Sequence, residues 1–405
     1  MSAVNKSSRT QGLCWSKVPL DEVATRGSGH TPNKKRAEYW NGNIRWVSLK
    51  DTFRMDRGLI SETAESITHA GLANSSAVVH PSGSVILLRD AGIGKSAVLQ
   101  GDMAVSQHFM VWNCGPRLDN WFLYYYLQSM KAEFERISNG STIKTIGLDY
   151  FRQLTIPLPE VEEQRLISQM FVDVDCLIAS LERLVAKKKA IKKGLIQELL
   201  SGRSRLPGFS GAWREVPFEN LATLVTERID PRNIPGNVKL VELEHVASGS
   251  GRLAGYATVS GAVSLKAVFR TGDVLFGKLR SYLRKYWLAE FEGVCSTEFW
   301  VLRPTDCNVN SFLRYVVESD CFIEVASGGY GTHMPRADWS IVRKLPIMLP
   351  SPDEQEAISR VLADADAELG ALYARLDKAR DMKIGMMKEL LTGRTRLIGQ
   401  GGNGE

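Results

Sequence analysis

The sequence predicts an α/β (α+β) protein that contains two mixed α/β domains in tandem repeat, separated by two long helices that form an antiparallel coiled coil. Residues 154–206 align without a gap on residues 345–397, and about 21 of the ~53 aligned positions are identical. A Trp-led segment, WSKVPLDEVA, recurs as WREVPFENLA. Segments with strand and short-helix patterns precede each aligned stretch. The chain is therefore two copies of one two-part unit.

The aligned stretches predict one long helix each, over residues 160–202 and 351–393. Prolines exclude a helix just before each start, and acidic residues directly after the start favour the positive helix N-terminus. Gly202 and Gly393 are natural helix ends. A helix of about 40 residues is about 60 Å long and cannot bury an apolar stripe alone. We therefore expect the two helices to pair, and the alternative is that each packs only on its own domain.

Apolar residues at alternating spacings of three and four predict the seam of this coiled coil. The stripe continues beyond the first helix's central part to Ile191 and Leu195. We expect the seam to involve Ile167, Met170, Val174, Leu177, Leu181, Leu184, Ile358, Val361, Leu372 and Leu376.

The two globular domains are expected at residues 13–159 and 203–350, with a flexible tail at 394–405. Runs such as SVILLRDAGIGKSAVL in the first domain and KAVFRTGDVLFGKLRSYLRKYWLAEF in the second have the apolar patterns of strands and turns. Short helices are expected to begin near Asn120 and Asn310, at equivalent places.

Composition places few limits on function. The 405 residues are 44% hydrophobic and 24% charged, and the net charge of +6 is a mild basic bias that is compatible with a polyanionic partner. The six cysteines are far apart and are interpreted as reduced core thiols. The polar N-terminal segment lacks the apolar core of a signal peptide, and no run is long enough to span a membrane. We expect a cytoplasmic protein.

Motifs that would indicate an enzyme are missing from the sequence. The GIGKS segment at 92–96 lacks the first glycine of a phosphate-binding loop, because Arg89 stands at that position, and we expect a strand-turn-strand connection there. No GxSxG, HExxH or dinucleotide-binding fingerprint is present, and the six histidines suggest no metal site. The sequence therefore predicts a chain with no catalytic or metal-binding residues.

Basic and polar side chains recur at corresponding loops of both halves and point to DNA. Lys and Arg bind phosphates, whereas Arg, Ser and Thr also bind base edges. The candidates in the first half are Lys34, Lys35, Arg36, Tyr39, Lys50, Ser141, Thr142 and Lys144. Those in the second half are Lys278, Arg280, Tyr282, Arg284, Lys285, Tyr330, Thr332, His333 and Arg336. A basic run from Lys187 to Lys193 is interpreted first as solvated helix surface and second as a DNA-facing end.

The sequence resembles the specificity subunits of type I restriction-modification systems over nearly the whole chain. The resemblance is carried by the EEQ and DEQ triplets at 162–164 and 353–355, by ELLSGRSRLPGF and ELLTGRTRL, and by GHTPNKKRAEYWNGNIRWVSLKD and GDVLFGKLRSYLRKYWLAEFEGVCSTEFWVLRP. It implies two target-recognition domains, each reading one half of a bipartite, asymmetric site in double-stranded DNA. It also implies helices that set the spacer and dock two modification (methyltransferase) subunits.

The resemblance further implies that this chain carries no cofactor. S-adenosylmethionine would be bound by the modification subunits, and ATP and Mg would be bound by restriction (translocase and nuclease) subunits. The alternative function is a coiled-coil scaffold that organises protein partners without reading DNA, for which the two long helices alone would suffice. An autonomous nuclease or methyltransferase is disfavoured because its catalytic motifs are missing.

Overall fold

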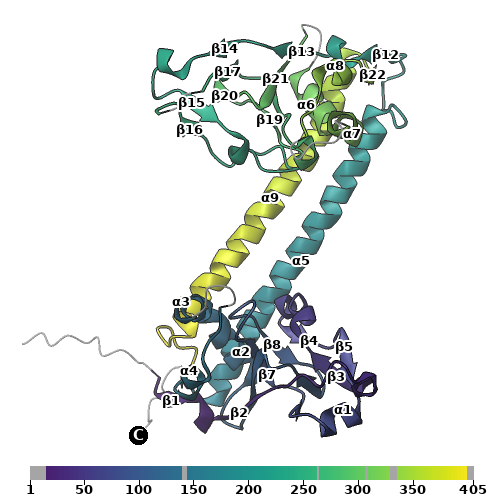
Figure 1. Cartoon of the computed structure of the whole chain (residues 1–405). Helices are drawn as coiled ribbons and strands as arrows, with labels where there is room; N and C mark the ends of the chain where they lie inside the picture. Colours follow the sequence, from purple (N-terminus) through teal and green to yellow (C-terminus); the bar gives the residue numbers. More distant parts are fainter. Residues whose placement is uncertain (1–14, 139–143, 262–263, 306–308, 329–334, 399–405) are drawn as a thin grey trace, which may run out of the picture. The chain divides into compact units, whose positions relative to one another are not determined.

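The computed structural model describes residues 15–138, 144–261, 264–305, 309–328 and 335–398. The chain forms two compact units, here called the first unit (residues 1–181 and 375–405) and the second unit (residues 182–374). Each unit contains one α/β domain together with a segment of each long helix (Figure 1). The predicted fold class is confirmed.

The two long helices are α5 (Val161–Leu200) and α9 (Pro352–Leu390), of 40 and 39 residues. They run antiparallel in both units. In the first unit Lys383 Nζ lies 2.6 Å from Asp175 Oδ1, and in the second unit Lys188 Nζ lies 2.6 Å from Glu368 Oε1. Residue numbers therefore rise along α5 as the numbers of their contacts on α9 fall, which is antiparallel pairing.

The seam between the helices corrects part of the sequence prediction. Ile167 and Phe171 of α5 are buried in the core of the first domain, and Ile358 and Leu362 of α9 are buried in the core of the second. Away from these cores, the buried positions include Val174, Leu181 and Val185 on α5 and Leu369, Leu372 and Leu376 on α9, whereas Val361 is half-buried. The expectation that Met170, Leu177 and Leu184 form the seam is wrong, because their exposed fractions are 38%, 41% and 37%. Spacings of 3-4-3 and 4-3-4 share every second position, and Phe171 and Val185 rather than Met170 and Leu184 are the buried residues between them.

Two sheets form the domain of the first unit. The five-stranded sheet has the order β2 (Ala24–Ser28), β10 (Phe109–Cys114), β7 (Val85–Leu88), β8 (Ser96–Leu99) and β4 (Leu59–Ile60). The four-stranded sheet has the order β5 (Glu65–Ile67), β3 (Trp40–Val47), β9 (Met103–Val105) and β6 (Val79–His80). Pairing is antiparallel except between β4 and β8 and between β3 and β9.

The fully apolar strand β7 shows why the sheet is buried on both faces. Val85 and Leu87 belong to one core cluster, which also contains Phe122 of α2 (Asn120–Ser129). Ile86 and Leu88, which alternate with them, belong to a second cluster with Val47 of β3. Alternate side chains of a strand point to opposite faces, so a strand between two cores needs no polar positions.

The second unit repeats this plan with a different strand order. One sheet contains β13 (Ala222–Val225), β21 (Phe299–Pro304), β18 (Val274–Gly277) and β19 (Tyr286–Leu288). The other contains β14 (Arg228–Ile229), β17 (Lys266–Phe269), β20 (Gly293–Ser296), β15 (Lys239–Val241) and β16 (Ala257–Thr258). In both units a pair of short strands lies beside the Trp-led segment: β1 (Lys17–Pro19) pairs with β11 (Thr155–Pro157), and β12 (Arg214–Pro217) pairs with β22 (Pro346–Leu349).

Short helices complete both domains. The remaining α-helices are α1 (His69–Ala73), α3 (Lys131–Ile137), α4 (Leu148–Arg152), α6 (Asn310–Glu318), α7 (Asp320–Ser327) and α8 (Trp339–Val342). The 3-10 helices are η1 (Leu20–Glu22), η2 (Ala37–Tyr39), η3 (Leu49–Asp51), η4 (Arg54–Arg57), η5 (Phe218–Asn220), η6 (Pro231–Asn233), η7 (Leu243–His245) and η8 (Ser281–Leu283). The predicted helix starts at Asn120 and Asn310 are confirmed.

The EEQ and DEQ triplets hold each domain to its long helix. Gln164 Oε1 accepts a hydrogen bond from the Asp119 amide at the start of α2, and Gln355 Oε1 accepts one from the Val309 amide at the start of α6. Both glutamines are buried. The amide side chain thus satisfies a backbone donor at the start of the neighbouring helix, where intrahelical acceptors are lacking.

The glutamate next to each of these glutamines binds the arginine-containing segment that follows the other long helix. Glu163, which is buried, accepts hydrogen bonds from the Arg396 guanidinium and from the Leu397 amide. Glu354 accepts hydrogen bonds from Arg205 and from the Trp213 indole. The repeated sequence SGRSRL or TGRTRL therefore serves one purpose twice: its second arginine neutralises a carboxylate buried at the start of a long helix.

A Lys-Asp-Tyr triad links each domain to both helices. In the first unit it consists of Lys383, Asp175 and Tyr125, and in the second unit of Lys192, Asp366 and Tyr315. Each tyrosine hydroxyl lies 2.9 Å from its aspartate. Burial alone would raise the pKa of Asp366, but Arg314 and Lys192 lower it below its ordinary value. Lys192 is buried and Lys193 pairs with Asp320, so the lysine run is only partly solvated surface.

The cysteine prediction is partly wrong. Cys295 is buried and burial raises its pKa, and burial likewise raises the pKa of the half-buried Cys114 to about 12. Cys176 and Cys321, however, are exposed rather than core residues. Within the described ranges no cluster of His, Cys, Asp or Glu has a geometry suited to a metal ion. None of the described helices is long and apolar enough to cross a membrane.

Candidate nucleic-acid interface

Each domain presents a hairpin loop that lies against a later loop. The first hairpin loop (residues 89–95) joins β7 to β8, and the second (residues 278–285) joins β18 to β19. A backbone bridge connects Asp90 to Thr145 in the first unit, and the corresponding bridge connects Leu279 to Arg336 in the second. The structure thus brings the sequence clusters near residue 144 and residue 336 to equivalent places.

The first hairpin loop contains the GIGKS segment, and the predicted strand-turn-strand connection is confirmed. β7 and β8 are antiparallel neighbours, and no helix follows the loop. Lys95 Nζ lies 2.7 Å from Asp56 Oδ1 and 3.4 Å from the Thr52 carbonyl oxygen. The lysine that would face a phosphate in a nucleotide-binding loop instead ties the hairpin loop to residues 52–56.

A basic hollow of about 590 Å³ lies beside the first hairpin loop. Lys95, Lys131 and Lys144 line it together with Glu135, which lies 4.0 Å from Lys131. Lys144 is exposed, and among the described residues its ammonium has no hydrogen-bond or ion-pair partner. Ser141 and Thr142, the other candidates of this loop, lie outside the described residues. Lys144 is therefore a cation available to an external phosphate.

Lys34, Lys35 and Arg36 lie in the exposed turn before η2. Within the described part of the chain, the ammonium groups of Lys34 and Lys35 contact no acidic group, whereas Arg36 lies 3.3 Å from Glu38. Tyr39 is half-buried, and its backbone lies so close to Gly71 that a Cβ there would meet the Tyr39 carbonyl oxygen at 2.5 Å. The two lysines remain available for DNA, and DNA binding by Tyr39 stays a prediction.

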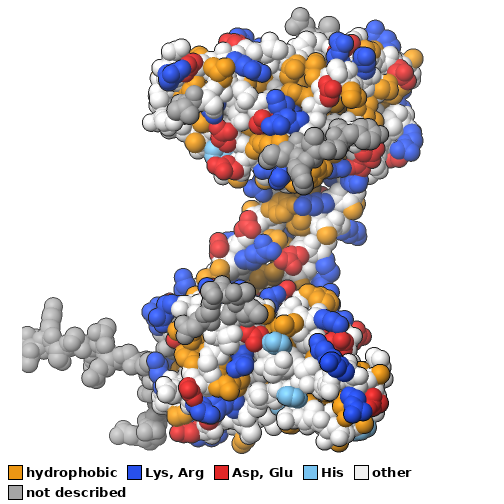
Figure 2. Space-filling view, viewed as in Figure 1, with side chains coloured by type: hydrophobic (Ala, Val, Ile, Leu, Met, Phe, Trp, Pro, Cys, Tyr) orange, Lys and Arg blue, Asp and Glu red, His pale blue; other side chains and the backbone are white. Residues whose placement is uncertain are grey.

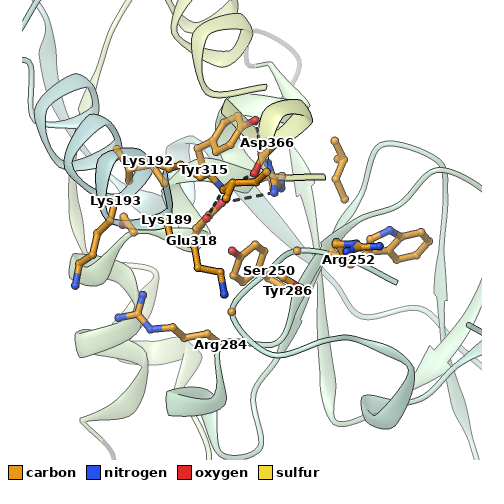
Figure 3. A pocket seen from close by; sticks show the side chains of 18 of the residues that line it. Lys189, Lys192, Lys193, Ser250, Arg252, Arg284, Tyr286, Tyr315, Glu318 and Asp366 are labelled. Carbon is orange, nitrogen blue, oxygen red and sulfur yellow. Dashed lines mark hydrogen bonds and ion pairs between the residues drawn. The ribbon is translucent and has the colours of Figure 1, made fainter. Parts of the chain in front are cut away.

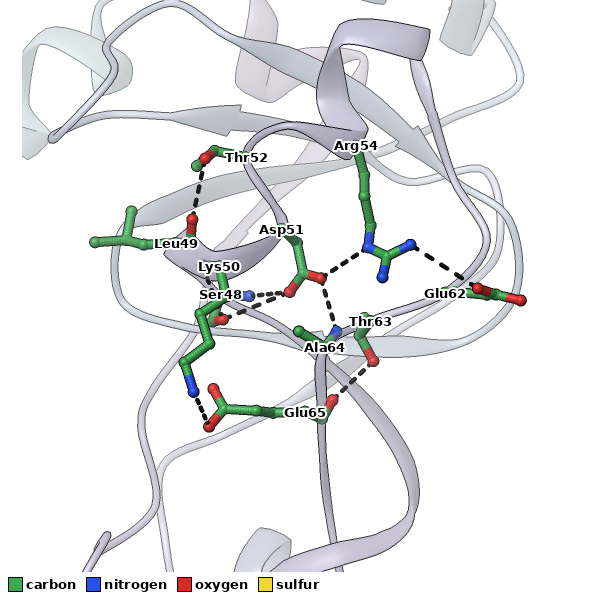
Figure 4. A network of polar contacts seen from close by, with 10 residues as sticks. All are labelled: Ser48, Leu49, Lys50, Asp51, Thr52, Arg54, Glu62, Thr63, Ala64 and Glu65. Atoms are coloured by element: carbon green, nitrogen blue, oxygen red, sulfur yellow. Dashed lines mark hydrogen bonds and ion pairs between the residues drawn. The ribbon is translucent and has the colours of Figure 1, made fainter. Parts of the chain in front are cut away.

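Lys50 belongs to a polar network rather than to a free basic cluster (Figure 4). Its ammonium lies 2.8 Å from Glu65 Oε1. The adjacent Asp51 is fully buried and accepts hydrogen bonds from the Ser48 and Ala64 amides and from Arg54. The network fixes the backbone around Lys50, and the side chain itself is paired at the surface.

Phe53 is an exposed aromatic residue that the sequence reasoning missed. Its exposed fraction is 63%, and the Arg54 guanidinium carbon lies 4.9 Å from the ring centroid. Arg54 is in turn paired with Asp51 and Glu62. The sequence signal for this residue is the adjacent aromatic and arginine in TFRMDR, a single pair that does not belong to a cluster of several cations.

The second hairpin loop holds both free and paired candidates. For Lys278 and Arg280, no ionic or hydrogen-bonding partner of the side chain occurs within the described ranges, and 55% of Tyr282 is exposed. Arg284 lies 2.5 Å from Asp320, and Lys285 Nζ donates to the Leu243 carbonyl oxygen. Arg280 and Tyr282 are exposed and Lys278 is half-buried, whereas Arg284 and Lys285 hold the loop to the domain.

Arg336 forms a bidentate ion pair with Glu298, in which Nε lies 3.0 Å from Oε2 and Nη2 lies 3.1 Å from Oε1. This pair raises the pKa of Arg336. The neighbouring candidates Tyr330, Thr332 and His333 lie outside the described residues. Both side chains of the pair are partly exposed, so a DNA phosphate or base that binds Arg336 would have to compete with Glu298.

On the face shown in Figure 2, the charged side chains form no continuous basic patch, because Lys and Arg side chains alternate with Asp and Glu side chains over each domain. Acidic partners also accompany the basic residues around a cavity of about 490 Å³ in the second unit, whose lining includes Lys192, Lys193 and Arg284 (Figure 3). Lys192 pairs with Asp366, and both Lys193 and Arg284 pair with Asp320.

These features define a class of protein: two repeated α/β domains, each with outward-facing cations beside a hairpin loop, attached to antiparallel helices. Comparison with known families gives the same result. Residues 14–193 and 261–376, more than half of the chain, match the family described as type I restriction modification DNA specificity domain. The chain belongs to this family.

Individual relatives are distant. The chain is 24% identical over 276 residues to the type I restriction enzyme EcoDI specificity subunit of Escherichia coli, and the match covers 59% of this chain and 61% of that protein. It is 29% identical over 168 residues to the MjaIX specificity subunit of Methanocaldococcus jannaschii, covering 40% of this chain and 38% of that protein. The chain thus matches less than two thirds of the length of either relative.

Solved structures share the fold. The type I restriction-modification S subunit from M. genitalium superposes with a TM-score of 0.56 at 14% identity, covering 95% of this chain and 98% of that one. A chain solved to explain complex assembly and conformational transition of the type I R-M system gives a TM-score of 0.60 at 17% identity, covering 95% and 99%. At these identities the likeness establishes the fold alone.

Proposed function

We propose that this chain is the non-catalytic DNA-recognition subunit of a type I restriction-modification complex. Its two domains, residues 13–159 and 203–350, each read one half of a bipartite DNA site. The observation that carries the proposal is the repeated loop pair, in which a hairpin loop is bridged to a later loop at equivalent places in both units. Each pair carries an exposed cation, Lys144 in the later loop of the first unit and Arg280 in the hairpin loop of the second. Family membership supports DNA as the ligand.

We further propose that the partner subunits, and not this chain, carry the catalytic sites. The chain acts on DNA in the cytoplasm, and its sequence offers no catalytic motif. The two modification subunits therefore bind S-adenosylmethionine, and the restriction subunits bind ATP and magnesium. This chain determines the DNA sequence at which the partner subunits act.

The exposed apolar stripe of α5 is the proposed docking surface for a modification subunit. Met170, Leu177, Leu184 and Ile191 recur every seven residues, and between 37% and 46% of each is exposed. Residues seven apart share one face of a helix, and a sustained heptad of apolar residues is what a second amphipathic helix packs against. We therefore assign a helix of the modification subunit as the occupant.

The docking surface is tested by co-purification of the chain with modification subunits. Leu177→Glu places a charge on the stripe and is expected to weaken complex formation strongly, because a buried unpaired carboxylate is costly. Ala186→Glu is the matched control, since Ala186 is exposed on α5 and lies away from the stripe. Equal binding by both variants and the parent would remove the stripe from the interface.

The main proposal is tested by sequencing the methylated positions in the DNA of a host that carries this chain with its modification subunits. A single split motif with two defined halves is the expected result, and deletion of this chain should abolish it. Methylation that persists without the chain, or methyl transfer by the rigorously purified chain alone, would contradict the assignment. If the complex assembles but leaves no sequence-specific mark, the scaffold alternative is favoured instead.

A further inference from the structure

The tip of the second hairpin loop exposes two apolar side chains. In η8, 55% of Tyr282 and 37% of Leu283 are exposed, while the preceding Ser281 is buried. The two residues that flank η8, Arg280 and Arg284, both have φ of +52°. Residues with side chains rarely adopt this left-handed conformation, and it persists only where surrounding contacts impose it. The loop is therefore held in a shape that its own residues do not favour.

The contacts that impose this shape come from several elements of the second unit. The Arg280 amide donates to the Pro335 carbonyl oxygen at 2.9 Å, and the Ser281 hydroxyl donates to the Ala326 carbonyl oxygen of α7 at 2.9 Å. Arg284 pairs with Asp320, and its carbonyl oxygen accepts from the Gly249 amide at 2.9 Å. The loop is thus anchored at its start, middle and end, and only its tip is left without support.

The charges beside the tip indicate the chemistry of its ligand. Lys278 and Arg280 precede the apolar pair in the same loop, and no acidic side chain of the described chain neutralises either of them. Proteins that bend DNA insert rigid apolar side chains between neighbouring base pairs, with nearby Arg and Lys on the phosphates. A preformed loop suits this role, because little further ordering is needed when it binds.

We propose that Tyr282 and Leu283 form a wedge that enters one base step of the half-site read by the second domain, unstacking that step and bending the DNA. This inference rests on the proposed function. The tyrosine ring stacks on an exposed base, Leu283 fills the opened step, and Lys278 and Arg280 bind the adjacent phosphates. Part of the selectivity of this domain then comes from how easily the step opens, since pyrimidine–purine steps unstack most readily.

The first hairpin loop does not repeat the wedge. Its tip consists of Ala91, Gly92 and Ile93, and only 8% of Ile93 is exposed. The exposed aromatic residue of the first unit, Phe53, belongs to a different segment, and the Arg54 guanidinium covers its ring. The wedge therefore distorts one half-site of the bipartite target and leaves the equivalent place in the other half undistorted.

The experiment uses the complex of this chain with its modification subunits and duplexes that carry the methylated motif. The fluorescent base 2-aminopurine is placed at each position in turn, and its fluorescence rises where stacking is lost. A methyltransferase also unstacks the adenine that it flips, so the informative quantity is the difference between the parent and Tyr282→Ala at each position. A parallel energy-transfer measurement between the duplex ends reports the bend.

The expected result is a severalfold fluorescence rise at one step of one half-site with the parent complex. Tyr282→Ala and Leu283→Ala should each reduce it, and Tyr282→Phe should retain it because the ring remains. Loss of one stacked base should weaken binding roughly tenfold to a hundredfold. The matched control, Phe53→Ala, should leave the rise unchanged. Tyr282 and Leu283 are exposed, so thermal unfolding of the variants should match that of the parent.

The outcomes separate the wedge from the proposed function. Specific binding by the parent with no position that differs between parent and Tyr282→Ala overturns the wedge and leaves the proposed function standing. A rise that Tyr282→Ala abolishes in both half-sites overturns the asymmetry. Absence of any specific DNA binding by the parent complex overturns the proposed function and the wedge together.

Discussion

Replacing Arg396 with Ala tests whether the repeated arginine stabilises the start of α5 in the first unit. Glu163 has a side chain that is only 1% exposed, and Arg396 approaches it through Nε at 3.0 Å and Nη2 at 2.7 Å. The substitution leaves the carboxylate buried with the Leu397 amide as a remaining donor. It therefore removes the only cation that pairs with this carboxylate among the described residues.

The size of the expected stability loss follows from the burial of the Arg396–Glu163 pair. Removing one partner of a buried ion pair typically costs about 3–5 kcal/mol. Here the Arg396 side chain is 23% exposed and a backbone donor remains, so water and the amide recover part of that loss. We expect the free energy of local unfolding, in which residues 396–397 separate from the start of α5, to fall by about 2–3 kcal/mol at neutral pH. For comparison, Arg360→Ala removes an exposed pair with Glu356 and should leave stability nearly unchanged, because water screens an exposed ion pair.

The pH dependence gives the sharper test. Burial alone would raise the pKa of Glu163, but the hydrogen bonds from Arg396 and Leu397 lower it below the ordinary value of 4.5. The parent therefore keeps this contribution above the ordinary pKa and loses it as the pH falls through the lowered value. Without Arg396, burial dominates and the pKa of Glu163 rises, so the carboxyl takes up a proton as the medium is acidified. The difference in stability between parent and variant should thus shrink below about pH 5.

Hydrogen exchange of backbone amides, followed from pH 4 to pH 7, is the suitable assay. A chain with two units does not satisfy the two-state assumption, and exchange reports local opening directly. Protection should drop at the start of α5 and around Leu397. Arg205→Ala is the matched variant and should have the same effect at the start of α9 in the second unit, because Arg205 pairs with Glu354. A loss of protection that is equal at pH 4 and pH 7 would refute the argument from the buried carboxylate.

Two further predictions concern DNA. Exchange of residues 13–153 for the equivalent domain of a relative should change one half of the methylated motif, and a simultaneous change in both halves would contradict separate reading by the two domains. Lys144→Ala should weaken binding to all sequences and reduce the slope of log affinity against log salt by about one, if its ammonium contacts a phosphate. Arg336→Ala should have a smaller effect on that slope because Glu298 already pairs with Arg336, and equal slopes for the two variants would contradict this distinction.

The fold was predictable because the repeat can be read directly from the sequence and the apolar periods are local properties of it. The long helices of 40 and 39 residues, the short helix starts and the strand-turn-strand connection at GIGKS all follow from patterns within about 40 residues. The seam was only half predictable. Both Met170 and Phe171 satisfy a spacing of three or four from Ile167, and only the packed structure decides that Phe171 is buried.

The candidate site was less predictable because free and paired cations look alike in a sequence. Arg336 and Lys278 are both basic loop residues, yet Arg336 meets Glu298, which is 38 positions away. Such partners depend on which strands become neighbours, and no local pattern encodes them. The strained backbone at Arg280 and Arg284 was equally invisible, because side-chain-bearing residues in the left-handed region carry no sequence signal of their own.

The last prediction treats the paired helices as the element that sets the spacer. A short insertion after Leu195 would not test this cleanly, because Ile196 and Leu199 are 5% exposed and belong to the core of the second domain. The structure instead favours seven-residue insertions in both helices, after Leu181 in α5 and after Leu376 in α9, which keep the apolar register.

Each inserted heptad adds about 10 Å of helix, which corresponds to about three base pairs at 3.4 Å each. The unspecified spacer of the methylated motif should lengthen by that number, with both half-site sequences unchanged because neither domain is altered. The same three base pairs rotate the second half-site by about three tenths of a turn around the duplex, so binding should weaken even at the new spacing. An insertion in α5 alone is the control and should disrupt pairing with α9. An active double-insertion variant that methylates the original spacing would show that the helices do not set the distance.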